Sequence, residues 1–431
     1  MVEPMKMRTF AIAALMIAMN PACTSEPNKQ SLKVTQVKQQ QISTYSPSAT
    51  DVKRLQETKK CQGCNLAGAD LSGVNLKRAN LQGSDLRAAN LSGANLSEVN
   101  LTGADLRQAN LSKTNLTGAK LTAAQLNWSG DSASRVNLRQ ANLSKANLIT
   151  AYMRGADLSE ANLTGAYLHA TDLNQAILIK ANLSKADLVG VKLSNADLTN
   201  INLQGANLLG VNLSEANLSN ANLQGANLQA ASLINATLNR ANLNKAILIL
   251  AKLNGANLSG ANLREANLFS AILPNADLSS ANMQKAYLHA ADLSKANLNS
   301  ANLIQSDLSA ALLNGANLSN ANLKGSNLKR ASLTGANLSQ VNLQGVNLQG
   351  ADLTEANLTQ ADMTKTNLAQ AYLTKTDLSS ADLQGATLNG AKVSGANLKN
   401  ANLKNAVGLN EPLITSEGQQ SGSHTSPNQH N

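Results

Sequence analysis

Ala69-Asp70-Leu71-Ser72-Gly73 and Ala221-Asn222-Leu223-Gln224-Gly225 are two copies of the five-residue unit that decides the fold of this chain. The unit, A-(N/D)-L-x-x, occurs 67 times between Asn65 and about Asn405, with one interruption. Its central residue is Leu in 63 copies, and the other four have Met153, Met283, Met363 or Val393. A period of five fits neither an amphipathic helix nor a flat strand. The sequence therefore predicts a stack of short units, each in contact only with its neighbours.

The central Leu and the Ala two residues before it are the only regularly apolar positions, so both are expected to point inward. The two residues after Leu are mostly Ser, Thr, Gln, Lys, Gly or Glu, which suits a turn at the surface. The Asn or Asp before Leu is expected to bond backbone groups at the corners, as these side chains do in turns. That role is structural, so no Asp at this position is read as catalytic.

The repeat resembles that of the pentapeptide-repeat proteins, and the resemblance covers about four fifths of the chain. It implies an all-β fold, a right-handed quadrilateral β-helix in which four repeats make one coil. Residues 20 apart would then stack vertically, and 67 repeats would give about 17 coils. At roughly 4.8 Å per coil the rod would be on the order of 80 Å long.

Composition and charge agree with a solenoid. Aromatic residues make up 2% of the chain, too few for a conventional globular core, but a core of stacked Leu needs none. The formal net charge is +10. Residues 61–405 carry 27 Lys and Arg against 20 Asp and Glu, so the repeats themselves are net positive.

The N-terminus resembles an export signal. Lys6 and Arg8 precede the apolar stretch Phe10 to Met19, which is too short to span a bilayer as a mature helix. Cys23 follows soon after, which suggests a signal peptide over 1–22 of the lipoprotein type, with Cys23 acylated after cleavage. Asn20 and Pro21 depart from the usual lipoprotein pattern. Cleavage without lipid and an uncut N-terminus with a free Cys23 remain the alternatives.

The remaining segments flank or interrupt the repeats. Residues 23–47 read as a flexible linker, and 48–64 as an N-terminal cap in which Thr50 or Asp51 starts a short helix. Residues 65–405 form the β-helix, and 406–431 a C-terminal cap followed by a disordered tail. A loop at 127–136 interrupts the repeats, because Leu126 and Leu138 are twelve residues apart where ten would keep the register.

Trp128 in that loop is the only Trp of the chain. Functional residues often lie on loops held by a rigid scaffold, so Trp128 is a candidate contact residue. The alternative is a tolerated insertion in which Trp128 covers a local gap.

Cys61 and Cys64 form a C-x-x-C motif where the repeats begin. No second Cys pair or nearby His completes a zinc site, and the chain lacks the βαβ unit in which a redox motif normally lies. If the protein is exported, a disulfide that pins the first coil is the favoured interpretation. Two unpaired thiols in a capping turn are the alternative.

Five lysines share one position of the repeat, and their spacings are all multiples of twenty. On a four-repeat coil they form a vertical column that could contact an anionic membrane, an acidic protein or a polyanion. The alternative is that Lys is a common turn residue multiplied by duplication. The five are Lys145, Lys185, Lys245, Lys285 and Lys365.

His169 and His289 lie in near-identical segments 120 residues apart, which places them on one face but too far apart for a shared site. No catalytic triad, carboxylate pair, phosphate loop or dinucleotide motif is present in the sequence. We therefore expect no catalytic residue, no bound metal and no cofactor.

These features favour a non-catalytic scaffold of the cell envelope or another exported compartment, periplasmic, lumenal or anchored to a membrane through Cys23. Its partner would be an unidentified protein or an anionic surface. Nucleic-acid binding by the basic face is an alternative, limited to the phosphate backbone because no aromatic residues for base stacking are interleaved with the basic residues. The resemblance also implies DNA mimicry toward topoisomerases, which the net positive repeats disfavour.

Overall fold

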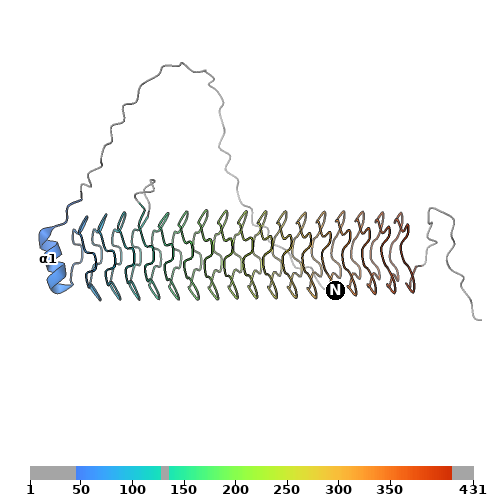
Figure 1. The fold of residues 1–431 in the computed structure, drawn as a ribbon, viewed down its shortest axis with the longest axis horizontal. Coiled ribbons are helices and arrows are strands. Elements are labelled where there is room, and N and C mark those ends of the chain that lie inside the picture. The colour runs from blue at the N-terminus through green and yellow to red at the C-terminus, as the bar shows by residue number, and fades with distance from the viewer. Residues whose placement is uncertain (1–44, 128–134, 410–431) are drawn as a thin grey trace, which may run out of the picture. The chain divides into compact units, whose positions relative to one another are not determined.

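The computed structural model describes residues 45–127 and 135–409. Every described residue belongs to one compact unit of the chain, Thr44–Asn431. Within the described residues the one helix is α1, Ala49–Thr58. The repeats follow it as a rod of stacked coils (Figure 1). Each strand is reduced to a single bridge residue, flanked by turns.

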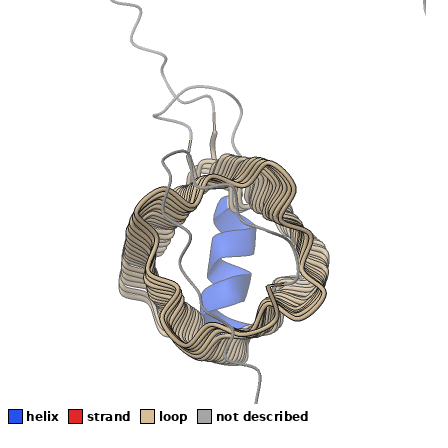
Figure 2. Cartoon of the chain, turned by 90° about the vertical axis from the view of Figure 1, so that its right-hand side faces the viewer, coloured by secondary structure: helices blue, strands red, loops and turns tan. Residues whose placement is uncertain are grey.

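Four repeats complete one coil. The bridge residues pair in parallel with residues 20 positions on, as Asn182 does with Asn202 and Asn202 with Asn222. Leu203 N donates to Asn222 O at 2.7 Å, and Asn222 N donates to Ile201 O at 2.8 Å. Seen along the axis, successive coils superimpose on one another (Figure 2). The spacing of 20 expected from the family resemblance is therefore present.

The interruption after Leu126 leaves the stack in register. Across it the bridge partners are 27 residues apart, from Asn110 to Asn137 and from Gln125 to Tyr152, so seven residues are inserted into one coil. Our expectation that ten residues would keep the register was wrong. Leu138 directly follows Leu126 as the next inward Leu of the described residues.

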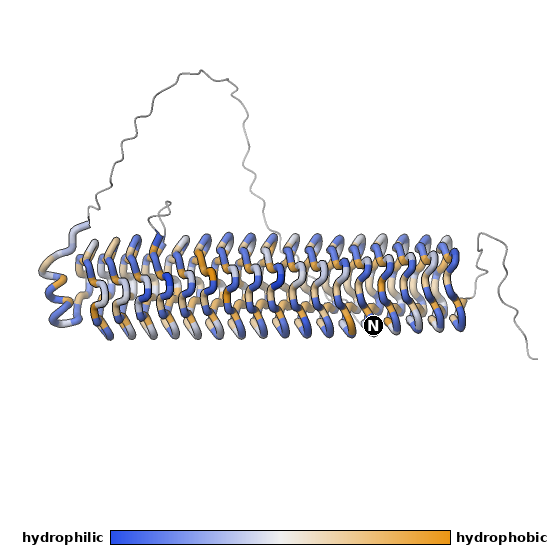
Figure 3. Tube along the Cα trace, viewed as in Figure 1, coloured by the Kyte–Doolittle hydropathy of each residue, from blue (hydrophilic) through white to orange (hydrophobic). Residues whose placement is uncertain are grey.

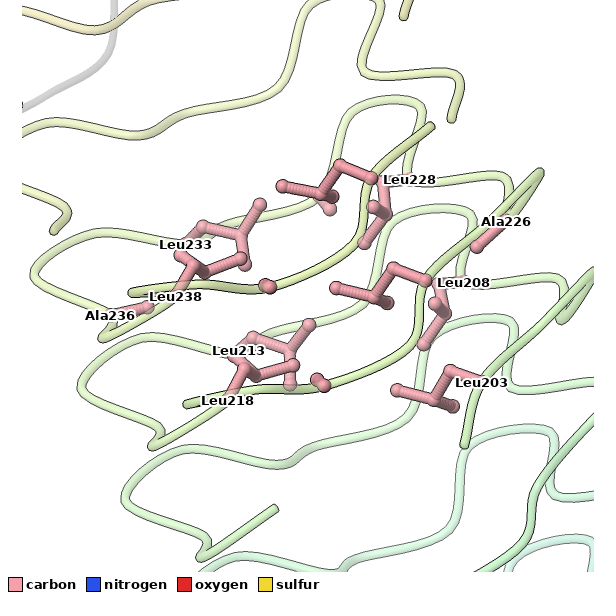
Figure 4. Close-up of a cluster of buried hydrophobic side chains, with 14 of the residues drawn as sticks. Leu203, Leu208, Leu213, Leu218, Ala226, Leu228, Leu233, Ala236 and Leu238 are labelled. Atoms are coloured by element: carbon pink, nitrogen blue, oxygen red, sulfur yellow. The ribbon is translucent and has the colours of Figure 1, made fainter. Parts of the chain in front are cut away.

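The core is a column of Leu layers. Leu208, Leu213 and Leu218 lie below Leu228, Leu233 and Leu238, one coil apart (Figure 4), and all six side chains have 0% of their surface exposed. Ala at the narrower position is equally buried, so hydrophobic and hydrophilic residues alternate around every coil (Figure 3). Full burial of a Leu stabilises the fold by about 2 kcal/mol, and the repeat supplies it every five residues.

Some repeats replace the buried Ala by Thr or Ser, and in most of them a hydrogen bond compensates for the hydroxyl, although Ser326 Oγ has no partner in the described part of the chain. Thr171 Oγ1 donates to Leu148 O at 2.8 Å, and Thr376 Oγ1 donates to Leu353 O at 2.8 Å. Both acceptors belong to the preceding coil, which ties adjacent layers together. A buried hydroxyl without such a partner would destabilise the fold.

Every corner is a tight turn whose second residue has a positive φ. Ala206 N donates to Leu203 O at 3.0 Å across Gly205, which has φ 62°. Positive φ at the second turn residue and not at the first is the pattern of a type II turn, which favours Gly or Asn. Many corners nevertheless use another residue there, such as Lys185 with φ 57°.

The residue before Leu bonds the corner backbone, as the sequence suggested. Asp70 Oδ1 accepts from Ser72 N at 3.1 Å, and Asn222 Oδ1 accepts from Gln224 N at 3.3 Å. The amide adds a bond between coils, since Asn222 Nδ2 donates to Asn202 Oδ1 at 3.1 Å. Asn thus serves both the turn and the stack, whereas Asp can only accept.

Helix α1 covers the N-terminal end of the rod (Figure 2). Its N-cap is Ser48, whose side chain accepts from Asp51 N at 3.3 Å, so the cap is neither Thr50 nor Asp51 as expected. Asp51 instead places a carboxylate in the first turn, where the helix dipole favours it. Leu55 is fully buried over the first coil.

The bridge pattern extends beyond the range expected from the repeat at both ends. It starts at Lys60, which pairs with Asn80, and ends at Val407, which pairs with Thr387. Leu409 is partly buried against the core, and the rest of the expected C-terminal cap and tail lies outside the described residues.

Candidate functional site

The two cysteines occupy regular positions of the first coil. Cys61 takes the place of the central Leu and Cys64 that of the buried Ala, and their sulfur atoms form a disulfide with an S–S distance of 2.10 Å. Both residues are buried. Because Cys64 N also donates to Cys61 O, the disulfide lies across the first corner of the rod. This geometry corresponds to the disulfide interpretation of the motif.

The polar side chains around the disulfide form hydrogen bonds or ion pairs. Arg54 Nη2 lies 2.6 Å from Cys64 Sγ and 3.4 Å from Asp51 Oδ1. Asp51 Oδ2 also accepts from Asn65 N at 3.0 Å. Asp51, Cys61 and Cys64 lie close enough to hold an ion, but disulfide sulfurs lack the thiolate charge that metals require and a guanidinium faces them. The arrangement fixes α1 onto the first coil.

The five column lysines all occupy the second position of one corner, with φ between 57° and 58°, and all are exposed. We call this edge the lysine corner. Lys245 Nζ lies 3.6 Å from Glu265 Oε2, and Arg264 pairs with the same carboxylate. Within the described part of the chain Lys145, Lys185 and Lys285 form no ion pair, so their charges face solvent.

The side of the rod that follows the lysine corner carries a feature that our sequence analysis missed. We define the apolar strip as the exposed or half-exposed large apolar residues between residues 142 and 290 on this side and on the corner that follows it, which we call the outer corner. It consists of Ile149, Tyr167, Val189, Leu209, Ile247, Ile249, Leu250, Phe269 and Tyr287. Six of the ten large hydrophobic residues that are exposed in the described region belong to it. Sorting the large apolar residues by position modulo 20 reveals it, since they lie far apart when read along the chain.

Aromatic rings stack in the strip. The ring centroids of Phe269 and Tyr287 are 6.1 Å apart, and those of Phe269 and His289 are 5.7 Å apart, with 10° between the planes in both pairs. His289 Nδ1 is 2.8 Å from Ser309 Oγ. His169 lies six coils away on the same corner, where its Nε2 is 3.2 Å from Asp187 Oδ2. The structure therefore separates the two histidines and gives them different partners.

An ion ladder covers the first coils on another side. Arg87 donates to both carboxylate oxygens of Asp85, at 2.9 and 2.6 Å, and lies 3.7 Å from Asp105 Oδ2. The Arg87 guanidinium also lies over the Tyr45 ring, 5.0 Å from its centroid. The hydrogen bonds from Arg87 lower the pKa of the Asp85 carboxyl below its usual range. These contacts are those of a stabilising surface network.

Cys23 and Trp128, the possible lipidation site and loop contact, lie outside the described residues. A search for membrane-spanning segments in the described part of the chain found no helix of sufficient length and apolar character.

The repeats match a family model described as pentapeptide repeats in 8 copies. The matched segments run from residue 60 to residue 407 and omit only 130–133, 300 and 380. A comparison with curated protein sequences gives no significant match.

Three solved structures illustrate the likeness. HetL from the cyanobacterium Nostoc sp. strain PCC 7120, a protein involved in the regulation of heterocyst differentiation, is 35% identical over 54% of this chain and 90% of its own, with a TM-score of 0.32. Rfr23 from the cyanobacterium Cyanothece 51142 is 37% identical over 27% of this chain and 63% of its own, with a TM-score of 0.16. A trypsin-treated QnrB1, a plasmid-mediated fluoroquinolone resistance protein, is 18% identical over 52% and 90%, with a TM-score of 0.28.

Proposed function

Since this chain belongs to the pentapeptide-repeat family, we propose that it is a non-catalytic scaffold that binds its partner through the outer surface of a β-helical rod. The observation that carries the proposal is the filled interior. Leu and Ala side chains with almost no exposed surface occupy it through coil after coil, which leaves the outer wall for contacts. In this proposal the 67 repeats make about 17 continuous coils, four to a coil, in a right-handed quadrilateral β-helix.

The scaffold is proposed to act in the cell envelope or another exported compartment. The basic residues and short apolar stretch before Cys23 support export, and a disulfide between Cys61 and Cys64 suits an oxidising compartment. Acylated Cys23 would anchor the rod, with residues 24–47 as a tether.

The experiment is the intact mass and N-terminal state of the protein isolated from its native host. A chain beginning at an acylated Cys23 supports the anchored form of the proposal. Cleavage without lipid supports a periplasmic or lumenal rod. An uncut chain beginning at Met1 overturns the exported location and returns cytosolic partners to consideration.

Binding of a polyanion at the lysine corner is the second candidate, favoured by the alignment of its lysines. Such binding would weaken steeply with added salt, because it depends on contacts with phosphate or sulfate groups alone. A salt titration with heparin and with duplex DNA tests it, and salt-insensitive or undetectable binding contradicts it. DNA mimicry toward a topoisomerase remains less favoured, because the repeats carry net positive charge.

A further inference from the structure

We propose that the apolar strip and the lysine corner together form a binding surface for an anionic lipid bilayer, on which the rod lies lengthwise. The inference rests on the proposed function and names the partner of its surface. It is built from the placement of exposed residues on one side of the coil, which no single motif of the sequence displays.

The strip is long, straight and concentrated on one side. From Tyr167 to Tyr287 it covers 120 residues, which is six coils or about 29 Å at ~4.8 Å per coil. Exposed fractions are 51% for Tyr167, 51% for Leu250, 37% for Phe269 and 40% for Tyr287. Exposed apolar patches of this extent mark sites of interaction, whereas single exposed apolar residues do not.

Charge borders the strip on one edge only. Between residues 142 and 290 the strip side and its two corners carry five positive residues against two negative ones, a net charge of +3 with His neutral. The positive residues are Lys145, Lys185, Lys245, Arg264 and Lys285, and the negative ones are Asp187 and Glu265. The outer corner, from Ile149 to Ala290, carries no Asp, Glu, Lys or Arg. Lysines beside apolar and aromatic side chains are the composition of surfaces that bind anionic membranes.

Shape favours a bilayer over a folded protein as the occupant. Leu209, Ile249, Leu250 and Phe269 lie at the corner turns, so they form a protruding straight edge and not a recess. A protein partner would need a matching groove to bury such an edge, while a bilayer admits it between head groups. Tyr167 and Tyr287 suit the same boundary, since each ring has an apolar body and a polar hydroxyl. Lysines one corner away can extend toward lipid phosphates while their stems remain against the apolar side.

The test is sedimentation of the full chain with vesicles of equal parts phosphatidylglycerol and phosphatidylcholine, compared with vesicles of phosphatidylcholine alone. The apolar variant gives each strip position a residue that the repeat uses there: Leu209→Gln, Ile247→Asn, Leu250→Gly, Phe269→Ser and Tyr287→Asn. The matched control changes the exposed residues of the next side: Tyr152→Asn, Leu312→Asn and Tyr372→Asn. We expect the apolar variant to lose about tenfold or more in partition coefficient, and the control to stay within about twofold.

The contribution of the lysines is tested with two variants that each lose three positive charges. Lys185→Asn, Lys245→Asn and Lys285→Asn remove three lysines of the lysine corner, and Lys180→Asn, Lys295→Asn and Lys375→Asn remove three from other corners at the same turn position. The first set should lower binding to the anionic vesicles by about tenfold or more, and the second should lower it much less. If both variants lost the same amount of binding, only the net charge of the rod would matter, and the proposed binding surface would be wrong.

A site-specific dye shows whether membrane binding comes from the rod or from the N-terminal segment. In a Cys23→Ser background an environment-sensitive dye is attached through Leu250→Cys or, as control, Leu312→Cys. A blue shift on anionic vesicles at position 250 alone supports the proposal. No shift at 250, equal shifts at both positions, or a strip that only drives association between copies overturns it. Thermal melts confirm that every variant is folded, and an uncut N-terminus would overturn export without changing these results.

Discussion

At the scale of single residues the repeat assigns each position one physical task. Leu fills the interior, Asn bonds the corner and the next coil, and the second turn residue accepts a positive φ. The first two tasks follow from residue type, so the sequence predicts them. The third does not, because Lys185, Leu250 and Gly225 share that backbone conformation although their side chains differ. The cost of the conformation is therefore distributed unevenly along the rod.

Gly225 has φ 64° and open space where a Cβ would be placed, so substitution there tests backbone strain alone. We expect Gly225→Ala to destabilise the protein by about 1 kcal/mol, because the left-handed conformation costs a residue with a Cβ about that much. Gly225→Asn should cost less, since Asn tolerates this conformation. Midpoints of thermal unfolding measure both variants. Equal stability of the wild type and the Ala variant would contradict the turn assignment.

Leu228 is fully buried within the stack of Figure 4. Leu228→Ala should destabilise the protein by about 2–5 kcal/mol through the cavity that it leaves. Leu228→Asp should be worse, because a buried carboxylate has no partner in an aliphatic core. Calorimetry of both variants tests this, with Gln229→Ser at the neighbouring exposed position as control. If the Asp variant kept full thermal stability, the inward placement of Leu would be wrong.

At the scale of elements the ends and the interruption depart most from what the sequence alone predicts. Ser48 caps α1 in place of Thr50 or Asp51, so the helix begins two or three residues earlier than the sequence indicated. The register expected across the insertion was also wrong, because counting residues does not tell which of them belong to the regular repeats. The Cys61–Cys64 pair could be located by its motif, but its place in the repeat frame required the bridge between Lys60 and Asn80.

The first coils should lose stability in acid. Hydrogen bonds from Arg87 lower the pKa of Asp85, so the folded state binds that proton less readily than the unfolded state. This contribution is complete above the ordinary carboxyl pKa, about 3.9, and is lost as the pH falls through the lowered value. Arg87→Ala should make stability less dependent on pH below about pH 4. Hydrogen exchange of the first coils between pH 2.5 and 6 measures this pH dependence, with Arg87→Lys as the control that keeps the charge. If Arg87→Ala had the same pH dependence of stability as the wild type, the role given to Arg87 would be wrong.

At the scale of the whole molecule the period of twenty determines the surface as well as the core. Each side of the rod is a column of residues that are distant in sequence, so a binding surface can be composed without any local motif. The lysine corner is predictable because five lysines recur at spacings that are multiples of twenty. The apolar strip is less apparent, since its residues are few and isolated when read along the chain.

A rod with paired coils has two ends, and α1 blocks one of them. Leu55→Asp should detach α1 from the first coil, because the buried carboxylate would lie over the Leu column. The first coil would then expose its backbone edge, and exposed edges pair with other chains. We expect association that grows with protein concentration, measured by sedimentation velocity. The control is Lys53→Asp on the exposed side of α1, and a strictly monomeric Leu55→Asp variant would show that α1 does not protect this end.

The bridges between residues 20 apart also mean that the position of a residue within the 20-residue period determines which column of the surface it joins. Gain or loss of 20 residues adds or removes a whole coil and leaves every later side chain above the same column. Gain or loss of five residues is equally harmless to the interior, yet it rotates all later residues by a quarter turn and mixes the columns. His169 and His289, 120 residues apart on one corner, are consistent with growth in whole coils. Selection on such a chain would therefore act on the lengths of insertions and deletions. Changes of 20 residues would be retained more often than changes of five, because only the former preserve the surface columns.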